Sequence, residues 1–270
     1  MESVAYMKKL IIFAAQECCG GMGDIAQLNS LFTVESVAAD VNAVAAAAKE
    51  NGYESFVYML HHYVDPENHR YLGKYLENCS IVDDKRLPDV LSVCDKAVFT
   101  GIPAMLGTIG AYIDRNYGNM WFDYKINGEK AGQMGMLKYL LAAYGIPVVA
   151  VMSDTAGVAE AKNLFGNIDT VVSVYNANIC PGGWQCCSSY PVGEMRKNLA
   201  KAVSNALKTD KAAPEKPVLP LNVEIEYIRT DFCDVALALN PKVKRIDARK
   251  IKYSVDRLQN IGDLITRGEE

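Results

Sequence analysis

The stretch QECCGGMGD, from Gln16 to Asp24, places a carboxylate, two adjacent thiols and three glycines directly after a short apolar run. Glycine-rich loops can present backbone N–H groups to a phosphate, carboxylates and thiols can bind metals, and a thiolate can act as a nucleophile. The same residues can also form only a tight turn. The stretch therefore has four interpretations: a phosphate cradle, a thiol site, a metal site or a turn.

Polar residues also follow two other apolar runs. His61-His62 comes after Phe56–Leu60, and Ser153-Asp154 comes after Pro147–Met152. A carboxylate and a histidine that meet beyond the ends of neighbouring strands can bind a metal or exchange protons. Glu17 and His62 are the first pair to consider, although a lone Glu and a lone His are more often exposed loop residues.

The elements that would position these residues alternate between β-type and helical patterns. Lys9–Ala14, Phe56–Leu60 and Pro147–Met152 read as buried strands, and Gln133–Tyr144 reads as a helix closed by Gly145. This order predicts an α/β fold, with a mainly parallel sheet and helices on both faces. Asn127-Gly128, which follows Trp121–Ile126, predicts a tight hairpin within this region.

The stretch Thr209–Pro220 carries three prolines and several charges, which is typical of a linker. We therefore divide the chain into an α/β domain (1–208), a linker (209–220) and a small C-terminal α+β domain (221–270).

Composition excludes several classes of function. The net charge is −4 and no run of Lys or Arg is present, so nucleic acid is not an expected partner. No stretch approaches the ~20 apolar residues of a membrane span. The apolar run of MKKLIIFAA is shorter than that of a signal peptide, and it is followed by Gln-Glu instead of a small-residue cleavage site. We expect a cytoplasmic protein. The eight cysteines, including the adjacent pairs Cys18-Cys19 and Cys186-Cys187, are too sparse for a disulfide scaffold and read as reduced.

Gly21-Met-Gly23-Asp-Ile-Ala26 matches the GxGxxA fingerprint of dinucleotide-binding sites, and it follows a strand. A dinucleotide site needs a helix that starts at the glycines and an acidic residue at the end of the second strand. Here the helix is expected only from Thr33, and the second strand ends in His61-His62. We expect no nucleotide cofactor.

The ordered motifs resemble those of the zinc-dependent D-aminopeptidase family. The matching segments are Ala15-Gln16-Glu17-Cys18, Met59-Leu60-His61-His62, Gly101-Ile102-Pro103-Ala104 and YKINGEKAGQMGMLKYLLAAYGIPVVAVMSD (Tyr124–Asp154). The similarity runs from about residue 9 to 175, and several motifs agree in order and spacing. The resemblance implies the same fold, a peptide-type substrate and assembly into a ring-like homo-oligomer.

The resemblance also indicates that the metal centre has diverged. The family's five metal ligands fall on Ala15, Glu17, His62, Pro103 and Gln133, and its catalytic histidine falls on Asp114. Of the five, Glu17 and His62 alone can ligate as the family's residues do, because Ala and Pro have no donor atom and a Gln carbonyl is a weak neutral ligand. We infer that most of the inherited ligands are replaced and that the pair of zinc ions is absent.

One hypothesis is a hydrolase with a rebuilt site that acts on a small amide or peptide. A single divalent metal, most simply zinc, would be held by Glu17, His62 and either Asp114 or Cys18. Alternatively, a thiolate of Cys18 or Cys19 would be the nucleophile, with His62 as base and Gly20-Gly21 supplying N–H donors.

The other hypothesis is a catalytically inactive relative that binds a small molecule or serves as a structural oligomer. It rests on the nature of the replacements, which remove donor atoms instead of adjusting a metal site. In either case Gln133, Asp154 and Trp184 are the expected walls of the substrate pocket, with Trp184 equally able to pack within its own loop.

Overall fold

The computed structural model describes residues 7–21, 31–60, 72–179, 185–189 and 191–265, and the structural statements below concern these residues. Within these ranges no helix is both long enough and apolar enough to cross a membrane. The helices and strands, in chain order, are β1 (Lys8–Ala14), α1 (Leu31–Glu50), β2 (Tyr53–Met59), β3 (Cys79–Ile81), α3 (Leu87–Leu91), β4 (Lys96–Thr100), β5 (Trp121–Ile126), β6 (Glu129–Lys130), α4 (Gln133–Tyr144), β7 (Val148–Ser153), α5 (Thr155–Phe165), β8 (Asp169–Val172), β9 (Val174–Ile179), β10 (Gln185–Ser189), α6 (Val192–Lys208), β11 (Leu221–Tyr227), α7 (Thr230–Leu239), β12 (Lys244–Arg245), β13 (Lys250–Val255) and the 3-10 helix η2 (Ile261–Leu264).

The main sheet has six strands in the order β3-β2-β1-β4-β7-β8, and every neighbouring pair is parallel. Its centre is β1, where Ile11 pairs with Phe56 of β2 on one side and Ala97 of β4 on the other. The α/β class predicted from the alternating pattern is confirmed.

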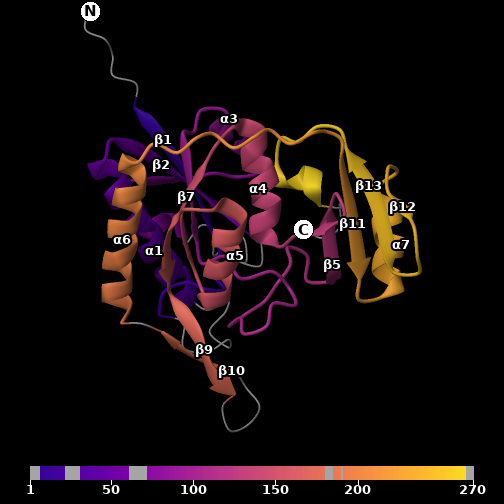
Figure 1. Ribbon diagram of the computed structural model, residues 1–270, viewed down its shortest axis with the longest axis horizontal. Coiled ribbons are helices and arrows are strands. Elements are labelled where there is room, and N and C mark those ends of the chain that lie inside the picture. The colour runs from indigo at the N-terminus through magenta and orange to yellow at the C-terminus, as the bar shows by residue number, and fades with distance from the viewer. Residues whose placement is uncertain (1–6, 22–30, 61–71, 180–184, 190, 266–270) are drawn as a thin grey trace, which may run out of the picture.

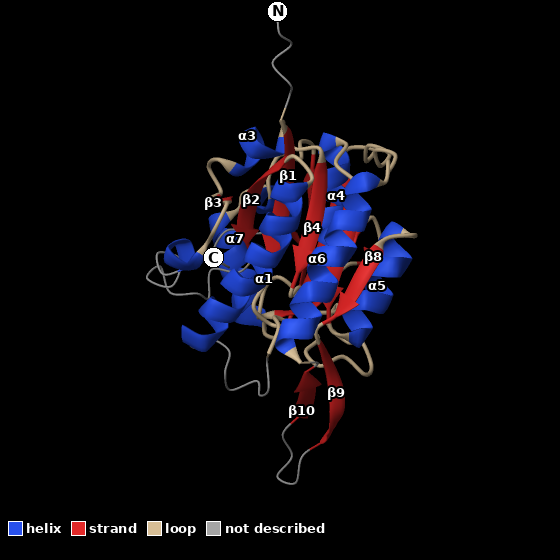
Figure 2. Ribbon diagram, turned by 90° about the vertical axis from the view of Figure 1, so that its left-hand side faces the viewer, coloured by secondary structure: helices blue, strands red, loops and turns tan. Residues whose placement is uncertain are grey.

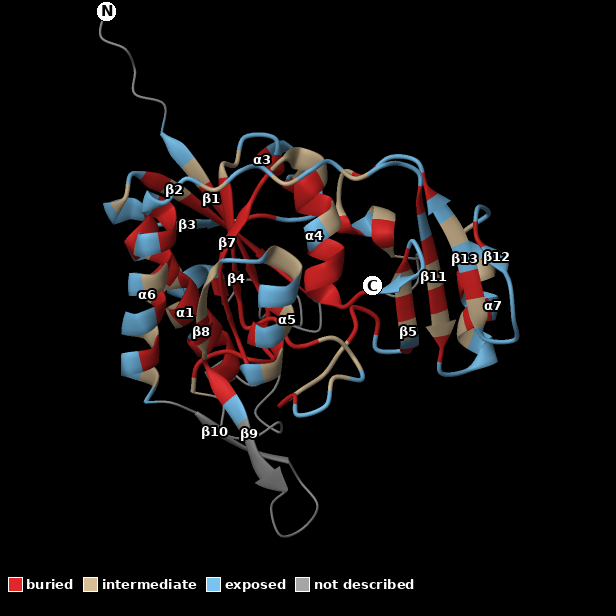
Figure 3. Ribbon diagram, in the orientation of Figure 1, coloured by how far each residue is buried: buried red, intermediate tan, exposed pale blue. Residues whose placement is uncertain are grey.

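Helices cover both faces of this sheet (Figure 1). On one face Leu10 and Ile12 of β1 belong to a buried cluster with residues of α1 and α6, two helices that stand side by side in Figure 2. On the other face Ile11 and Phe13 join a cluster with residues of α4. A strand buried on both faces must be apolar at successive positions, which is why KKLIIFA carries no alternation after its lysines. The buried residues accordingly concentrate on the central strands (Figure 3).

A second sheet has the order β12-β13-β11-β5-β6, and all of its pairs are antiparallel. The Asn127-Gly128 hairpin prediction is confirmed, because β5 and β6 pair across these residues and both have positive φ, 53° and 85°. The sheet is not built from 221–270 alone, since β5 pairs with β11 (Ile126 with Val223). Trp121 and Tyr124 of β5 stack at 4.8 Å between ring centroids, both are buried, and the Tyr124 hydroxyl donates to Leu264 O of η2 at 2.9 Å.

The stretch 209–220 contains no helix or strand, and its first residues contact the region of the parallel sheet. Two lysines hold it there. Lys96 Nζ donates to the carbonyls of Ala206, Leu207 and Thr209 at the end of α6, and Lys211 Nζ donates to the carbonyl of Val148 at 2.9 Å. Lys96 thus donates to carbonyls of the last turn of α6, where a helix leaves carbonyls without intrahelical partners. The division at 209–220 remains a prediction.

Candidate functional site

The candidate site lies beyond the carboxyl ends of β1 and β4, where ligands bind in open parallel sheets. Backbone hydrogen bonds join the two segments, from Ala15 N to Thr100 O (2.9 Å) and from Cys18 N to Gly101 O (3.0 Å). Gly101 has a φ of 70°, and a Cβ at this position would lie 2.2 Å from Ala15 O. Glycine is therefore required for the close approach that brings residues 15–20 against the loop after β4.

An ion pair between Glu17 and Arg115 connects these two segments. Arg115 Nη1 lies 2.5 Å from Glu17 Oε1, and the Glu17 side chain is fully buried. Arg115 also donates to the side chain of Asn119, and its backbone N–H donates to Ala104 O at 2.9 Å. Burial raises the pKa of Glu17, and the neighbouring guanidinium partly offsets this rise. Arg115 is thus the cation that accompanies Glu17 in this structure.

Three buried side-chain oxygens near this ion pair accept no hydrogen bond from the protein. They are Glu17 Oε2, Asn116 Oδ1 and Gln133 Oε1. Gln133 is the first residue of α4, and its Nε2 donates to Asn116 O over 3.5 Å. Buried polar atoms normally have a partner, and here three acceptors without one lie on neighbouring segments.

The loop after β4 is held in place by carboxylates that accept its backbone N–H groups. The acceptor and donor pairs are Asp114 Oδ2 with Gly107 N (2.6 Å), Asp154 Oδ2 with Tyr112 N (2.6 Å) and Glu160 Oε2 with Met105 N (2.7 Å). Asp154 Oδ1 also caps α5 by accepting from Gly157 N at 2.6 Å. The predicted site residues Asp114 and Asp154 therefore have structural contacts, and Asp154 also lies within electrostatic range of Cys18.

The thiols of Cys18 and Cys19 are buried, with 0% and 1% of each residue exposed. Burial raises the pKa of Cys18, and the nearby Asp154 raises it further. Burial likewise raises the pKa of Cys19, with Asp40 as the next contribution. A nucleophilic cysteine needs a lowered pKa and access to its substrate. These surroundings favour the interpretation of both side chains as core residues, which pack with the α1 and α6 side of the sheet.

The side chains at the positions that the resemblance assigns to metal ligands do not fit a pair of zinc ions. Ala15 and Pro103 offer no donor, Gln133 is neutral, and one oxygen of Glu17 is bonded to Arg115. Across the described part of the chain, no group of three or more His, Cys, Asp or Glu side chains is arranged to hold a metal ion. Two divalent ions need several carboxylates to balance four positive charges, and these residues do not provide them.

Two predicted site residues, His62 and Trp184, lie outside the described residues. Their assigned roles as metal ligand or base and as pocket wall remain predictions. Among the other predicted residues, the structure brings Glu17 close to Cys18 and Cys19, and Asp154 close to Asp114.

Sequence reasoning missed Arg115 and Asn116. A signal was present, because Asp114 and Arg115 are the sole charged residues between Gly101 and Gly118. A basic residue next to an acidic one, in an otherwise uncharged loop after a central strand, is a candidate partner for a buried carboxylate from the neighbouring strand end.

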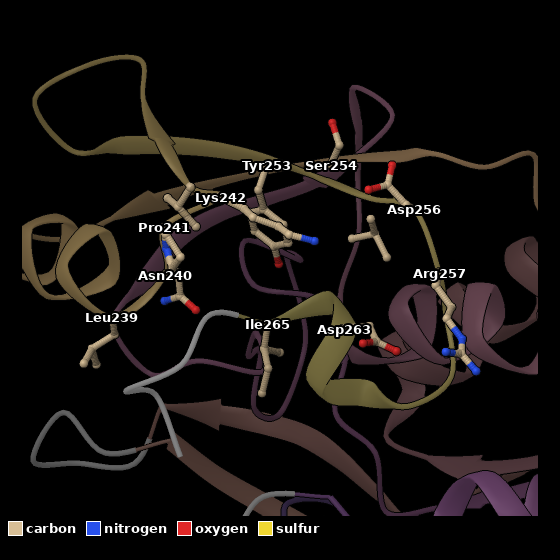
Figure 4. Close-up of a pocket in the computed structure, with 12 residues that line it drawn as sticks. Leu239, Asn240, Pro241, Lys242, Tyr253, Ser254, Asp256, Arg257, Asp263 and Ile265 are labelled. Carbon is tan, nitrogen blue, oxygen red and sulfur yellow. The ribbon is translucent and has the colours of Figure 1, made fainter.

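A separate hollow of about 460 Å³ lies in the second sheet unit, between α7, β13 and η2. Tyr253 points from β13 toward Ile265 at its base (Figure 4). Asp263 in its wall is already used by the fold, since its Oδ2 accepts from the N–H groups of Gln259 (2.7 Å) and Asn260 (3.0 Å). Most of the other lining residues are exposed, and none of the predicted site residues is among them.

Comparison with known proteins relates the whole arrangement to one family of peptidases. The family model described as D-aminopeptidase (peptidase M55) matches residues 84–266, which is more than half of the chain. The solved structure of the Zn-dependent D-aminopeptidase DppA from Bacillus subtilis, described as a self-compartmentalizing protease, is similar with a TM-score of 0.76 at 17% identity, over 94% of this chain and 93% of that one.

Two further solved structures are similar only weakly. AviGT4, a glycosyltransferase involved in avilamycin A biosynthesis, has 14% identity and a TM-score of 0.29 over 75% of this chain and 50% of that one. A short chain dehydrogenase from Mycobacterium smegmatis has 10% identity and a TM-score of 0.28 over 79% and 93%. A comparison with curated proteins finds no match.

The chain belongs to the D-aminopeptidase family, as its motifs predicted. Membership supports a peptidase-like hydrolase function, and the likeness to the Bacillus subtilis structure confirms the α/β fold.

Proposed function

We propose that the protein uses the family's pocket to bind a small amide or short peptide without a pair of zinc ions. The observation that carries this proposal is the ion pair between Arg115 Nη1 and Glu17 Oε1 at 2.5 Å. Glu17 lies at a position where the resemblance places a metal ligand. In a zinc-dependent relative a metal ion would supply the positive charge beside this carboxylate, and here the guanidinium of Arg115 supplies it. A fully buried carboxylate is costly unless it is paired with a cation or accepts several hydrogen bonds.

The second candidate is hydrolysis of the same ligand at a single-metal site. Glu17 Oε2 favours it, because this oxygen is buried and accepts no hydrogen bond within the protein. His62 and Asp114 would be the other ligands. The version with Cys18 or Cys19 as nucleophile has less support, since burial raises the pKa of both thiols.

Metal analysis tests these alternatives. The protein is purified without chelators or nickel affinity, and metal per subunit is measured for the wild type and His62→Ala. The proposal expects metal far below one equivalent in both, together with measurable binding of short peptides by calorimetry. Two equivalents of zinc would contradict it. One equivalent that is lost in His62→Ala would establish the single-metal candidate instead, and peptide cleavage would then be assayed.

We also propose self-association into a ring-like homo-oligomer. The support is the likeness to the Bacillus subtilis relative, a self-compartmentalizing protease with the same fold. Light scattering after size-exclusion chromatography tests this proposal, and a mass of 29.6 kDa, that of one chain, would contradict it.

A further inference from the structure

The three unpartnered oxygens next to the ion pair share one chemical property: each can only accept a hydrogen bond. Glu17 is 0% exposed, Gln133 is 1% exposed and Asn116 is 4% exposed, so solvent does not reach these atoms freely. A buried acceptor without a donor is destabilising. Because the three acceptors lie on segments that contact one another, one ligand group with several N–H donors would satisfy them together.

The three side chains come from three different segments that contact one another. Glu17 follows β1, Asn116 lies in the loop after β4, and Gln133 opens α4. Arg115 is bonded to Glu17, and the carbonyl of the next residue, Asn116, accepts from Gln133 Nε2. The loop itself is held by the contacts of Asp114 and Asp154 with its backbone. The backbone that carries Arg115 and Asn116 is therefore held in place by contacts within the fold.

The nature of the acceptors selects the ligand group. A primary ammonium has three N–H donors and a single positive charge, which suits three acceptor oxygens of which one belongs to a carboxylate. A divalent ion suits them less well, because two of the oxygens are neutral and Arg115 already places one positive charge on the same carboxylate.

We propose that Glu17 Oε2, Asn116 Oδ1 and Gln133 Oε1 bind the primary ammonium group of the ligand, while Arg115 holds Glu17 in position. The proposal rests on the proposed function, since it specifies which part of a peptide-like ligand this pocket recognises. The proposal thereby assigns a binding role to Asn116, which is not one of the family's metal-ligand positions.

The first experiment compares alanyl-alanine with N-acetyl-alanyl-alanine by calorimetry, because acetylation removes the ammonium and leaves the rest of the ligand. We expect the acetylated peptide to bind at least about tenfold more weakly to the wild type. Gln133→Met and Asn116→Leu, which remove one acceptor each at similar volume, should weaken the free dipeptide by about tenfold and leave the acetylated one unchanged. Asn198→Ala, an exposed position on α6, is the control and should change neither.

The second experiment does not depend on peptide binding. Methylammonium chloride has the three N–H donors and tetramethylammonium chloride has none, so only the former should raise the melting temperature of the wild type, and it should not raise that of Gln133→Met. Urea unfolding of the free variants confirms that they fold: Asn116→Leu removes an unpartnered acceptor, and Gln133→Met also removes only the long 3.5 Å hydrogen bond to Asn116 O.

The outcomes separate the two proposals. Equal binding of both peptides, with equal effects of the two salts, overturns the ammonium site and leaves peptide binding intact. Stabilisation by methylammonium without any peptide binding supports the ammonium site and contradicts the proposed function. No response to either peptides or salts overturns both.

Discussion

At the level of single residues, the charge of Glu17 depends on Arg115. The carboxylate is fully buried, and the guanidinium that pairs with it lowers the cost of keeping the charge there. Breaking a buried pair by removing one member is costly because the other charge stays buried.

We expect Arg115→Leu to lower the free energy of unfolding by about 3 kcal/mol, as measured by urea denaturation at pH 7. Adding Glu17→Gln to this variant should recover part of the loss, since the uncompensated charge is then gone. Arg229→Leu is the matched control. Arg229 forms an ion pair with Asp231 in which the two side chains are 63% and 58% exposed. Removing the Arg229 guanidinium should therefore leave the free energy of unfolding unchanged within error. Equal effects of the two single substitutions would contradict the assigned role of Arg115.

The thiols provide a second prediction at this scale. Cys18 and Cys19 should react with iodoacetamide more slowly than Cys79 and Cys94, because the latter are partly exposed and have pKa values raised only to about 12 by burial. Mass spectrometry of the modified peptides over time and pH measures this order. Faster modification of Cys18 or Cys19 would instead restore the cysteine-based hydrolase to consideration.

Among the elements, the loop after β4 depends on a carboxylate that titrates near neutrality. Burial raises the pKa of Glu160 on α5 to about 7, the N–H of Met105 opposes this rise, and Asp154 adds to it. The folded protein therefore favours the neutral form of Glu160 more than the unfolded chain does. This contribution to stability is complete below pH 4.5 and is lost as the pH rises through 7.

We expect Glu160→Gln to remove this dependence. Between about pH 4 and pH 8 the wild type should lose about 3 kcal/mol of stability that the variant retains, because the Gln carbonyl still accepts from Met105 N and never ionises. Urea unfolding across this pH range gives the comparison, with the exposed Glu194→Gln on α6 as control. If the free energy of unfolding changes with pH in the same way for the wild type and Glu160→Gln, then Glu160 is not the group responsible for the loss of stability.

Elements with local causes are predictable from sequence, and contacts between distant segments are not. Asn127-Gly128 predicts its hairpin and Gly145 ends α4 with a φ of 73°, because both depend on nearby residues. The helix expected near Thr33 is α1, which begins at Leu31, so Thr33 lies buried within the helix and does not cap it. Glu17 is identifiable as a site residue, whereas its partner Arg115 is missed because a loop conformation fixes that pairing.

On the scale of the whole molecule, the two sheets share one core. Residues of β1, α4, β5 and β11 all belong to the same buried cluster, and β5 comes from the middle of the chain. The predicted division into 1–208 and 221–270 follows the composition of the linker, but a composition cannot show that a strand on one side pairs with a strand on the other.

A chain that ends at residue 208 should consequently fail to fold cooperatively. Without residues 209–265, the edge of β5 is unpaired and the buried Tyr124 hydroxyl loses its acceptor, Leu264 O. We expect this truncated chain to lose its near-ultraviolet circular dichroism and its sharp urea transition, while a chain ending at residue 265 keeps both. A cooperative transition in the 1–208 chain would show that the first unit is independent.

The pairing of Ile126 with Val223 also determines the order in which a newly made chain can fold. The ribosome releases residues from the N-terminus, so every strand of the parallel sheet, through Val172 of β8, emerges before β11 does. One edge of the β5–β6 hairpin stays unpaired until β11, which ends at Tyr227, leaves the exit tunnel, and the sheet is extended only after β13, which ends at Val255, follows. Folding of this part of the nascent chain is therefore completed only after β11 and β13 have emerged, and until then the open edge of β5 is exposed to chaperones and to neighbouring nascent chains.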